Sequence, residues 1–130
     1  MSKASKIYVL NGPNLNLLGD REPNIYGNVS LKDIEKSLSS YGKENNSEIH
    51  FKQTNHEGEL IEFVHEASKK ANAIIINPAG YSHTSVALLD ALLTVKIPII
   101  EVHISNIFRR EDFRHNSYVS KAAIGVISGL

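Results

Sequence analysis

Three observations predict an α/β fold built on a parallel sheet. Five short apolar runs rich in β-branched residues are spread along the chain. Three of them are nearly continuous rather than alternating, as expected for strands covered on both faces. Segments with helical period lie between the runs, and strands that alternate with helices form right-handed crossovers. The simplest such arrangement is a flavodoxin-like, five-stranded parallel sheet with helices on both faces.

The expected strands are the apolar runs themselves. They are IYVL at 7–10, EIHF at 48–51, AIIIN at 73–77, IPIIEV at 97–102 and AIGVI at 123–127. The first, third and fourth are the nearly continuous ones, which suits strands covered on both faces.

Three helices are expected between these strands. The first begins at Ser30, where Ser30-x-x-Asp33 is a capping pattern, and it is expected to stop at Gly42. The second follows Gly58 and repeats apolar residues at helical spacing from Leu60 to Ala71. The third places Val86, Leu89 and Leu93 at helical spacing after a Ser/Thr-rich start and ends before Pro98.

Length and charge limit the classes of protein that need to be considered. At 130 residues, the chain is expected to form a single catalytic domain, 1–130. Fourteen basic and fourteen acidic residues balance, which predicts no nucleic-acid partner and no polybasic membrane binding. No apolar run approaches a signal peptide or a membrane span, so a cytoplasmic protein is expected. There is no cysteine, which excludes disulfides and thiolate metal sites.

Polar motifs follow three of the expected strands. The first strand leads into NGPNLN (11–16), the third into NPAGYSHTS (77–85) and the fourth into EVHISN (101–106). In an open parallel sheet, ligands bind beyond the carboxyl ends of the strands, where the strand order reverses. The three motifs are therefore expected to meet at one edge and form a site.

Two of these motifs carry groups suited to anion binding and proton transfer. In NPAGYSHTS, the Ser/Thr residues can cap the following helix, while Asn77 and His83 are not needed for capping and suggest a carboxylate or phosphate ligand. In EVHISN, period-two alternation puts Glu101 and His103 on one side of the strand, where the carboxylate can fix the tautomer of the imidazole. The alternatives are a helix cap alone for the Ser/Thr cluster and, for each histidine taken singly, a hydrogen-bonded structural role, which is the more common one. The six histidines show no HExxH and no close pair, so no catalytic metal is expected.

The loop from Asn11 to Asn28 has no periodic segment, and connections of this length are usually lids, binding loops or disordered. It contains Arg21 and, five residues later, Tyr26. A nearby guanidinium favours the phenolate form of tyrosine and would make it a better base. A surface tyrosine beside a loop arginine is the alternative. Further along the chain, Arg110 and Arg114 are four residues apart and would share a face on a helical turn.

Taken together, four segments resemble the type II 3-dehydroquinate dehydratases. They are NGPNLNLLGDREPNIYG, QTNHEGELIEFVHEA, INPAGYSHTSVALLDAL and EVHISNIFRREDFRHNSYVS. The resemblance runs from about Lys6 to Leu130. It implies a flavodoxin-like fold and a cofactor-free lyase that dehydrates 3-dehydroquinate to 3-dehydroshikimate through an enolate, in aromatic biosynthesis or quinate breakdown.

The resemblance also implies roles for catalytic residues. Tyr26 would remove a proton from C2 of the substrate, and Arg21 would lower the pKa of Tyr26. Asn14 would hold a water against the enolate oxygen, a donor aimed at developing charge. His103 would protonate the departing C1 hydroxyl, with Glu101 orienting it.

Substrate binding is implied for a second group of residues. Asn77 and the backbone N–H groups of Ile104 and Ser105 would bind the substrate carboxylate, while His83 and Arg114 would hold ring hydroxyls. The resemblance thus moves the anion site from the helix terminus mainly to the loop after the fourth strand.

The resemblance further implies a trimer that assembles into a dodecamer, with Asp90 reaching into the site of a neighbouring subunit. The chain departs from the family pattern at Arg109, where many relatives have a small residue, and at Asn116, where a second histidine is common.

A non-catalytic small-anion-binding domain on the same fold is the alternative function. The first strand ends in Asn11-Gly12 and not in the acidic residues of a phosphoacceptor domain, and NGPNLN is neither GxGxxG nor a flavin phosphate loop. A catalytically inactive homologue would also share the fold.

Overall fold

The computed structural model describes residues 3–20 and 28–129. Its centre is a five-stranded sheet in the order β2-β1-β3-β4-β5, with every neighbouring pair parallel. The strands are β1 (Ser5–Asn11), β2 (Ser47–Gln53), β3 (Ala73–Asn77), β4 (Ile99–His103) and β5 (Gly125–Ser128). All five expected strands are therefore present, and the flavodoxin-like prediction is confirmed.

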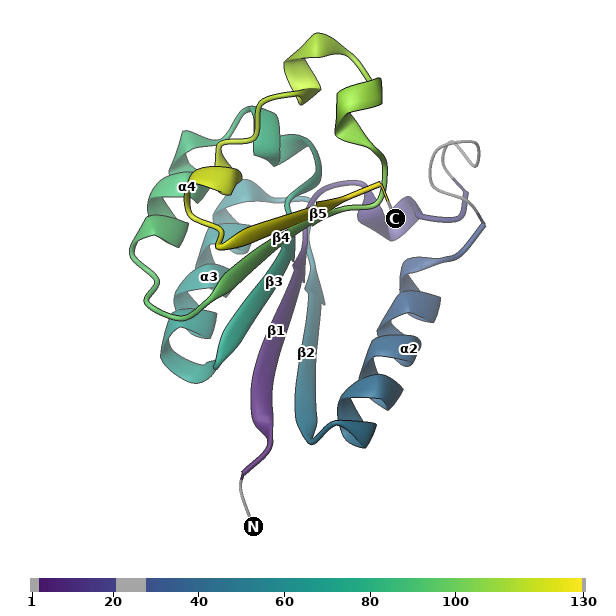
Figure 1. Ribbon diagram of the computed structural model, residues 1–130, viewed down its shortest axis with the longest axis vertical. Helices are drawn as coiled ribbons and strands as arrows, with labels where there is room; N and C mark the ends of the chain where they lie inside the picture. The colour runs from purple at the N-terminus through teal and green to yellow at the C-terminus, as the bar shows by residue number, and fades with distance from the viewer. Residues whose placement is uncertain (1–2, 21–27, 130) are drawn as a thin grey trace.

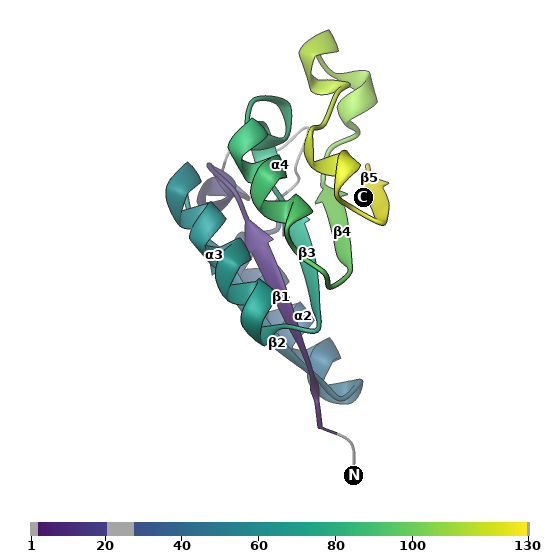
Figure 2. The same ribbon diagram turned by 90° about the vertical axis from the view of Figure 1, so that its left-hand side faces the viewer.

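Helices cover both faces of the sheet. They are α2 (Leu31–Glu44), α3 (Glu57–Lys70) and α4 (Val86–Leu93). Helices α3 and α4 lie side by side on one face, and α2 covers the other face beside β2 (Figures 1 and 2). Short 3₁₀ helices occupy the connections: η1 (Leu15–Leu17), η2 (Ala79–His83), η3 (Ile107–Arg109), η4 (Asp112–Arg114) and η5 (Val119–Lys121).

The first helix begins as predicted but continues past its expected end. The side chain of Ser30 accepts a hydrogen bond from the Asp33 backbone, and the Asp33 carboxylate accepts one from the Ser30 backbone, which completes the capping box. Gly42 does not stop α2, because it packs against the strand: a Cβ there would lie 2.9 Å from the Ser47 carbonyl oxygen. Glycine at position 42 therefore allows α2 to lie close to the start of β2, and it does not form a turn.

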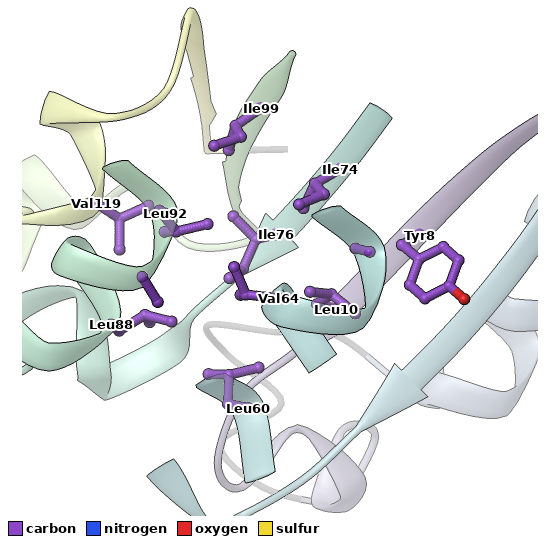
Figure 3. Packing of buried hydrophobic residues seen from close by; sticks show 12 residues of the cluster. Tyr8, Leu10, Leu60, Val64, Ile74, Ile76, Leu88, Leu92, Ile99 and Val119 are labelled. Carbon is purple, nitrogen blue, oxygen red and sulfur yellow. The ribbon is translucent and has the colours of Figure 1, made fainter. Parts of the chain in front are cut away.

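The core lies between the sheet and the α3–α4 layer (Figure 3). Its members are buried apolar residues of three strands, both helices and η5: Tyr8, Leu10, Leu60, Val64, Ala67, Ile74, Ile76, Leu88, Ala91, Leu92, Ile99 and Val119. Seven of the eight residues of α4 are apolar, and the predicted spacing of Val86, Leu89 and Leu93 did not identify its buried face. This helix turns Leu88 and Leu92 inward, whereas Val86 and Leu93 are 52% and 58% exposed.

The strand order reverses at β1, which pairs with β2 on one side and β3 on the other. Strand order of this kind places a crevice beyond the carboxyl ends of β1 and β3. In Figure 1, the segment between β4 and β5 rises above that end of the sheet. The fold thus brings the three polar motifs to a single edge.

Candidate active site

A pocket of about 140 Å³ lies beyond the carboxyl ends of β1, β3 and β4. Seven residues that the sequence singled out line it: Asn14, Asn77, His83, His103, Ile104, Ser105 and Arg114. Arg110 lines it as well. The prediction that the strand-end motifs meet is therefore confirmed by the geometry.

The backbone at Gly12 and at Asn14 holds the motifs at this edge. The backbone N–H of Gly12 donates to the Asn77 carbonyl at 2.8 Å, which joins the ends of β1 and β3. A Cβ on Gly12 would lie 2.4 Å from the carbonyl oxygen of Pro78, so only glycine allows this approach. Asn14 adopts a left-handed conformation with φ 70°, and its backbone N–H donates to the side chain of Asn55 at 2.9 Å.

Glu101 and His103 form a buried pair at the end of β4. The Nε2 of His103 donates to the Glu101 carboxylate, and the two side chains are 5% and 0% exposed. Within the described part of the chain, the other ring nitrogen, Nδ1, has no partner, and the ring lines the pocket. The expected arrangement, a carboxylate that fixes the tautomer and leaves one nitrogen for the ligand, is present.

The ionisation of Glu101 is set by opposing effects. Burial raises its pKa, but hydrogen bonds from His103, Ser117 and Ser120 lower it more, so the net pKa lies below the ordinary carboxyl value. The carboxylate therefore remains charged at neutral pH and can stabilise a positive charge on His103.

His83 lies across from His103, with ring centroids 6.4 Å apart and planes inclined by 21°. Its Nδ1 donates to the backbone carbonyl of Asn116 at 2.8 Å. Burial lowers the pKa of His83, only partly offset by this hydrogen bond, and favours the neutral ring. Because Asn116 contributes a backbone atom, this contact does not depend on its side chain.

Beyond β4, two backbone N–H groups are available for an anion. Among residues 3–20 and 28–129, the amides of Ile104 and Ser105 donate no hydrogen bond, and both residues line the pocket. On the facing motif, the Oδ1 of Asn77 accepts from the Ala79 N–H at 3.2 Å, which leaves its amide group as a donor. Three neutral donors on the lining of one pocket suit a carboxylate.

The arginines approach from the segment between β4 and β5. The sequence suggested one helical turn carrying Arg110 and Arg114, but two separate 3₁₀ helices occur there. Both side chains nevertheless line the pocket. The Nε of Arg114 donates to Glu111 at 2.6 Å, and Arg110 donates to the Ser105 hydroxyl at 3.4 Å.

Four predicted residues are not placed in the pocket. Glu101 is buried and bonded to His103, which does line it. Arg21 and Tyr26 lie outside the described residues. Asp90 is exposed on α4 and does not line the pocket. Ser117 and Ser120, which contact Glu101, were not singled out from the sequence, because neither falls in a strand-end motif or a periodic segment.

Within the described ranges, no group of three or more His, Cys, Asp or Glu side chains is arranged to hold a metal ion. Across those same residues, none of the helices is both long and apolar enough to cross a bilayer.

Known proteins resemble the chain along nearly its whole length. The sequence model of a family described as "Dehydroquinase class II" matches residues 5–130. A 3-dehydroquinate dehydratase of Idiomarina loihiensis is 57% identical over 131 residues, covering 100% of this chain and 86% of the relative. A catabolic 3-dehydroquinase of Talaromyces marneffei is 56% identical over 124 residues, covering 95% and 71%.

The solved structures agree with the sequence relatives. The type II dehydroquinase of Propionibacterium acnes superposes with a TM-score of 0.95 at 44% identity, covering 100% of this chain and 90% of that one. These comparisons give no support to a non-catalytic anion-binding domain.

Proposed function

The chain belongs to the class II dehydroquinase family and is a 3-dehydroquinate dehydratase, and from this premise we propose how its residues divide the reaction. The observation that supports the division best is local to residues 101–105. His103 and the N–H groups of Ile104 and Ser105, which bond no acceptor among the described residues, line one pocket, and the buried carboxylate of Glu101 bonds His103. The groups for proton transfer and for carboxylate binding therefore come from one short segment of the chain.

In the first step, the Tyr26 phenolate removes the proton from C2 of the substrate, and the electron pair moves onto the C3 carbonyl to give an enolate. Arg21 keeps the pKa of Tyr26 low enough for the phenolate to form. Asn14, which lines the pocket, holds a water that donates to the enolate oxygen.

In the second step, the enolate collapses, the bond between C1 and its hydroxyl breaks, and the Nδ1 of His103 protonates the leaving oxygen, which departs as water. The product is 3-dehydroshikimate, formed by anti elimination. Glu101 stabilises the imidazolium from which this proton comes. A positioned general acid contributes roughly a hundredfold to ten-thousandfold.

Substrate orientation uses the remaining pocket residues. The amides of Ile104 and Ser105 and the side chain of Asn77 bind the substrate carboxylate. Neutral His83 and charged Arg114 hold the ring hydroxyls, and Arg110 adds positive charge beside Ser105. The anionic end of the substrate thereby fixes which hydroxyl faces His103.

Hydrogen–deuterium exchange at C2 separates the two proton-transfer roles. In D₂O, Tyr26→Phe is expected to lose both exchange at C2, followed by NMR, and formation of the conjugated enone, followed by ultraviolet absorbance. His103→Gln is expected to lose enone formation while still exchanging C2, because the enolate forms but its hydroxyl does not leave.

Three results would contradict parts of this mechanism. Exchange that persists in Tyr26→Phe would remove Tyr26 as the base, and full turnover in His103→Gln would remove His103 as the acid. Turnover that disappears with chelator or after borohydride treatment of the enzyme with substrate would contradict the enolate route altogether.

A trimer that assembles into a dodecamer is part of the proposal. The exposed face of α4 carries Val86, Asp90 and Leu93 at positions i, i+4 and i+7, so one carboxylate lies between two exposed apolar side chains. Such a face is suited to contact with another subunit, into whose site Asp90 would reach.

Mixing two inactive variants tests this arrangement. After dissociation and reassembly, Asp90→Ala and Tyr26→Phe subunits should restore activity at about one site in four, because some sites then combine an intact Tyr26 with a neighbour's intact Asp90. No recovery from a reassembled mixture would contradict the role across subunits. The cytoplasmic location remains a prediction from the sequence.

A further inference from the structure

Glu101 has more hydrogen-bond donors than pairing with one histidine requires. Besides His103, the hydroxyl of Ser117 donates to its Oε2 at 2.6 Å, and the hydroxyl of Ser120 donates to its Oε1 at 2.5 Å. The carboxylate is 0% exposed, so water does not supply these bonds. Both oxygens of a buried charge are therefore satisfied by protein groups.

The two serines belong to a segment that also contacts the other histidine of the pocket. We call Asn116–Ser120 the serine segment. The carbonyl of Asn116 accepts from His83, and the N–H of Tyr118 donates to the Ser82 carbonyl at 2.8 Å. The serine segment thus bonds His83 directly and bonds Glu101, the carboxylate that pairs with His103.

The serine segment is itself anchored in the core. Val119 is 0% exposed and packs with the buried cluster that includes residues of α4. The N–H groups of Ala122 and Ala123 donate to its carbonyl at 2.9 and 3.2 Å. The hydroxyls of Ser117 and Ser120 are therefore presented from a fixed backbone.

We propose that Ser117 and Ser120 are positioning residues for the dehydration, acting on His103 through Glu101. The inference rests on the proposed role of His103 as the general acid. Neither serine lines the pocket, so neither touches the substrate. Their hydroxyls hold the carboxylate in one orientation, and the carboxylate in turn holds the imidazole with Nε2 bonded and Nδ1 toward the pocket.

Removing a hydroxyl has a defined chemical consequence. Without Ser120, the Oε1 of Glu101 is a buried acceptor that has no donor among the described residues, because His103 and Ser117 bond Oε2. The carboxylate then rotates, admits water or takes up a proton. Each response changes the orientation or the charge available to His103.

Steady-state kinetics and NMR of Ser117→Ala, Ser120→Ala and the double variant test the proposal. In each single variant, kcat should fall about tenfold, the low end of the contribution of a hydrogen bond to an ionised group, with KM nearly unchanged. The ¹⁵N and Nε2–H signals of the His103 ring should shift in all three proteins. Ser120→Thr, which keeps the hydroxyl, should have the kcat and the His103 signals of the wild type, because residue 120 is exposed and has room for a methyl group.

Controls separate positioning from general destabilisation. Ser47→Ala, at the start of β2, removes a hydroxyl that donates to the Asn45 carbonyl, its one partner among the described residues. This change should leave kcat and the His103 signals unchanged. The ring of His50 provides an internal NMR reference.

Wild-type kcat in the double variant would overturn the proposal. So would a lower kcat with unchanged His103 signals and no recovery in Ser120→Thr, because that pattern indicates only a structural role. The NMR comparison needs no substrate, so it remains informative even if His103→Gln turns over and the proposed acid role fails.

Discussion

The sequence Glu-x-His occurs twice, once in each of two strands, and the two copies have different surroundings. Glu48 and His50 lie in β2, and Glu101 and His103 lie at the end of β4. In both, the Nε2 of the histidine bonds the carboxylate two residues earlier, at 2.8 Å in β2. Alternation along a strand is enough to form the pair.

What differs is burial and position. The β2 pair is 32% and 53% exposed for His50 and Glu48, whereas the β4 pair is 5% and 0% exposed for His103 and Glu101. The His50 ring stacks on Tyr8 at 4.8 Å. His103 of the β4 pair lines the pocket, and Glu101 of that pair has two additional hydroxyl donors. The same local pattern is therefore structural in one strand and is proposed to be catalytic in the other.

Neutralising each carboxylate should give the largest contrast. Glu101→Gln is expected to lower kcat roughly a hundredfold or more, because the amide carries no charge and presents an N–H group to donors. Glu48→Gln should change kcat by less than about twofold, since exposed ion pairs contribute little. Steady-state assays with 3-dehydroquinate measure both values.

Circular dichroism and urea unfolding should show that both glutamine variants are folded. If the two variants lost activity equally, the distinction between the pairs would be wrong. If Glu101→Gln kept wild-type kcat, the carboxylate would have no part in the chemistry.

The sequence was sufficient to predict the sheet and most of the pocket, because both follow from short-range patterns. Continuous apolar runs identified the strands, and the rule for parallel sheets placed Asn77 and His103 at one edge. Gly42 was misjudged because a glycine that stops a helix and one that permits close packing look alike in sequence. Ser117 and Ser120 could not be found, since their contact with Glu101 depends on how an irregular segment folds back.

An intermediate effect, on the free energy of unfolding, is expected from changing Tyr8, whose ring stacks on His50 of the β2 pair. Its hydroxyl donates to Glu66 at 2.6 Å, and burial together with this carboxylate raises the pKa of Tyr8 to about 12. The folded protein therefore keeps the Tyr8 proton while the unfolded chain loses it near pH 10. The stability that Tyr8 contributes is complete below about pH 10 and is lost as the pH rises toward 12.

Tyr8→Phe should lower the free energy of unfolding by about 1 kcal/mol near neutral pH and leave kcat unchanged. Urea unfolding at about pH 9 and about pH 11 should show a smaller alkaline loss in the variant than in the wild type. Equal losses in the two proteins would mean that Tyr8 does not titrate abnormally. A large drop in kcat would mean that the β2 region affects the site.

The smallest effect is expected at Ser82, one of two buried serines that differ, as the two pairs do, in their partners. Ser85 caps α4 by accepting from the Leu88 N–H at 2.9 Å and donates to Glu57, so Ser85→Ala should cost about 1 to 2 kcal/mol. Ser82 is 0% exposed, yet among the described residues its hydroxyl has no partner. Its desolvation is uncompensated, so Ser82→Ala should leave the free energy of unfolding within about 0.5 kcal/mol or raise it. Urea unfolding measures both values. If Ser82→Ala lowered the free energy of unfolding as much as Ser85→Ala, the Ser82 hydroxyl would have to make a hydrogen bond, because removing a buried hydroxyl without a partner removes no stabilising contact.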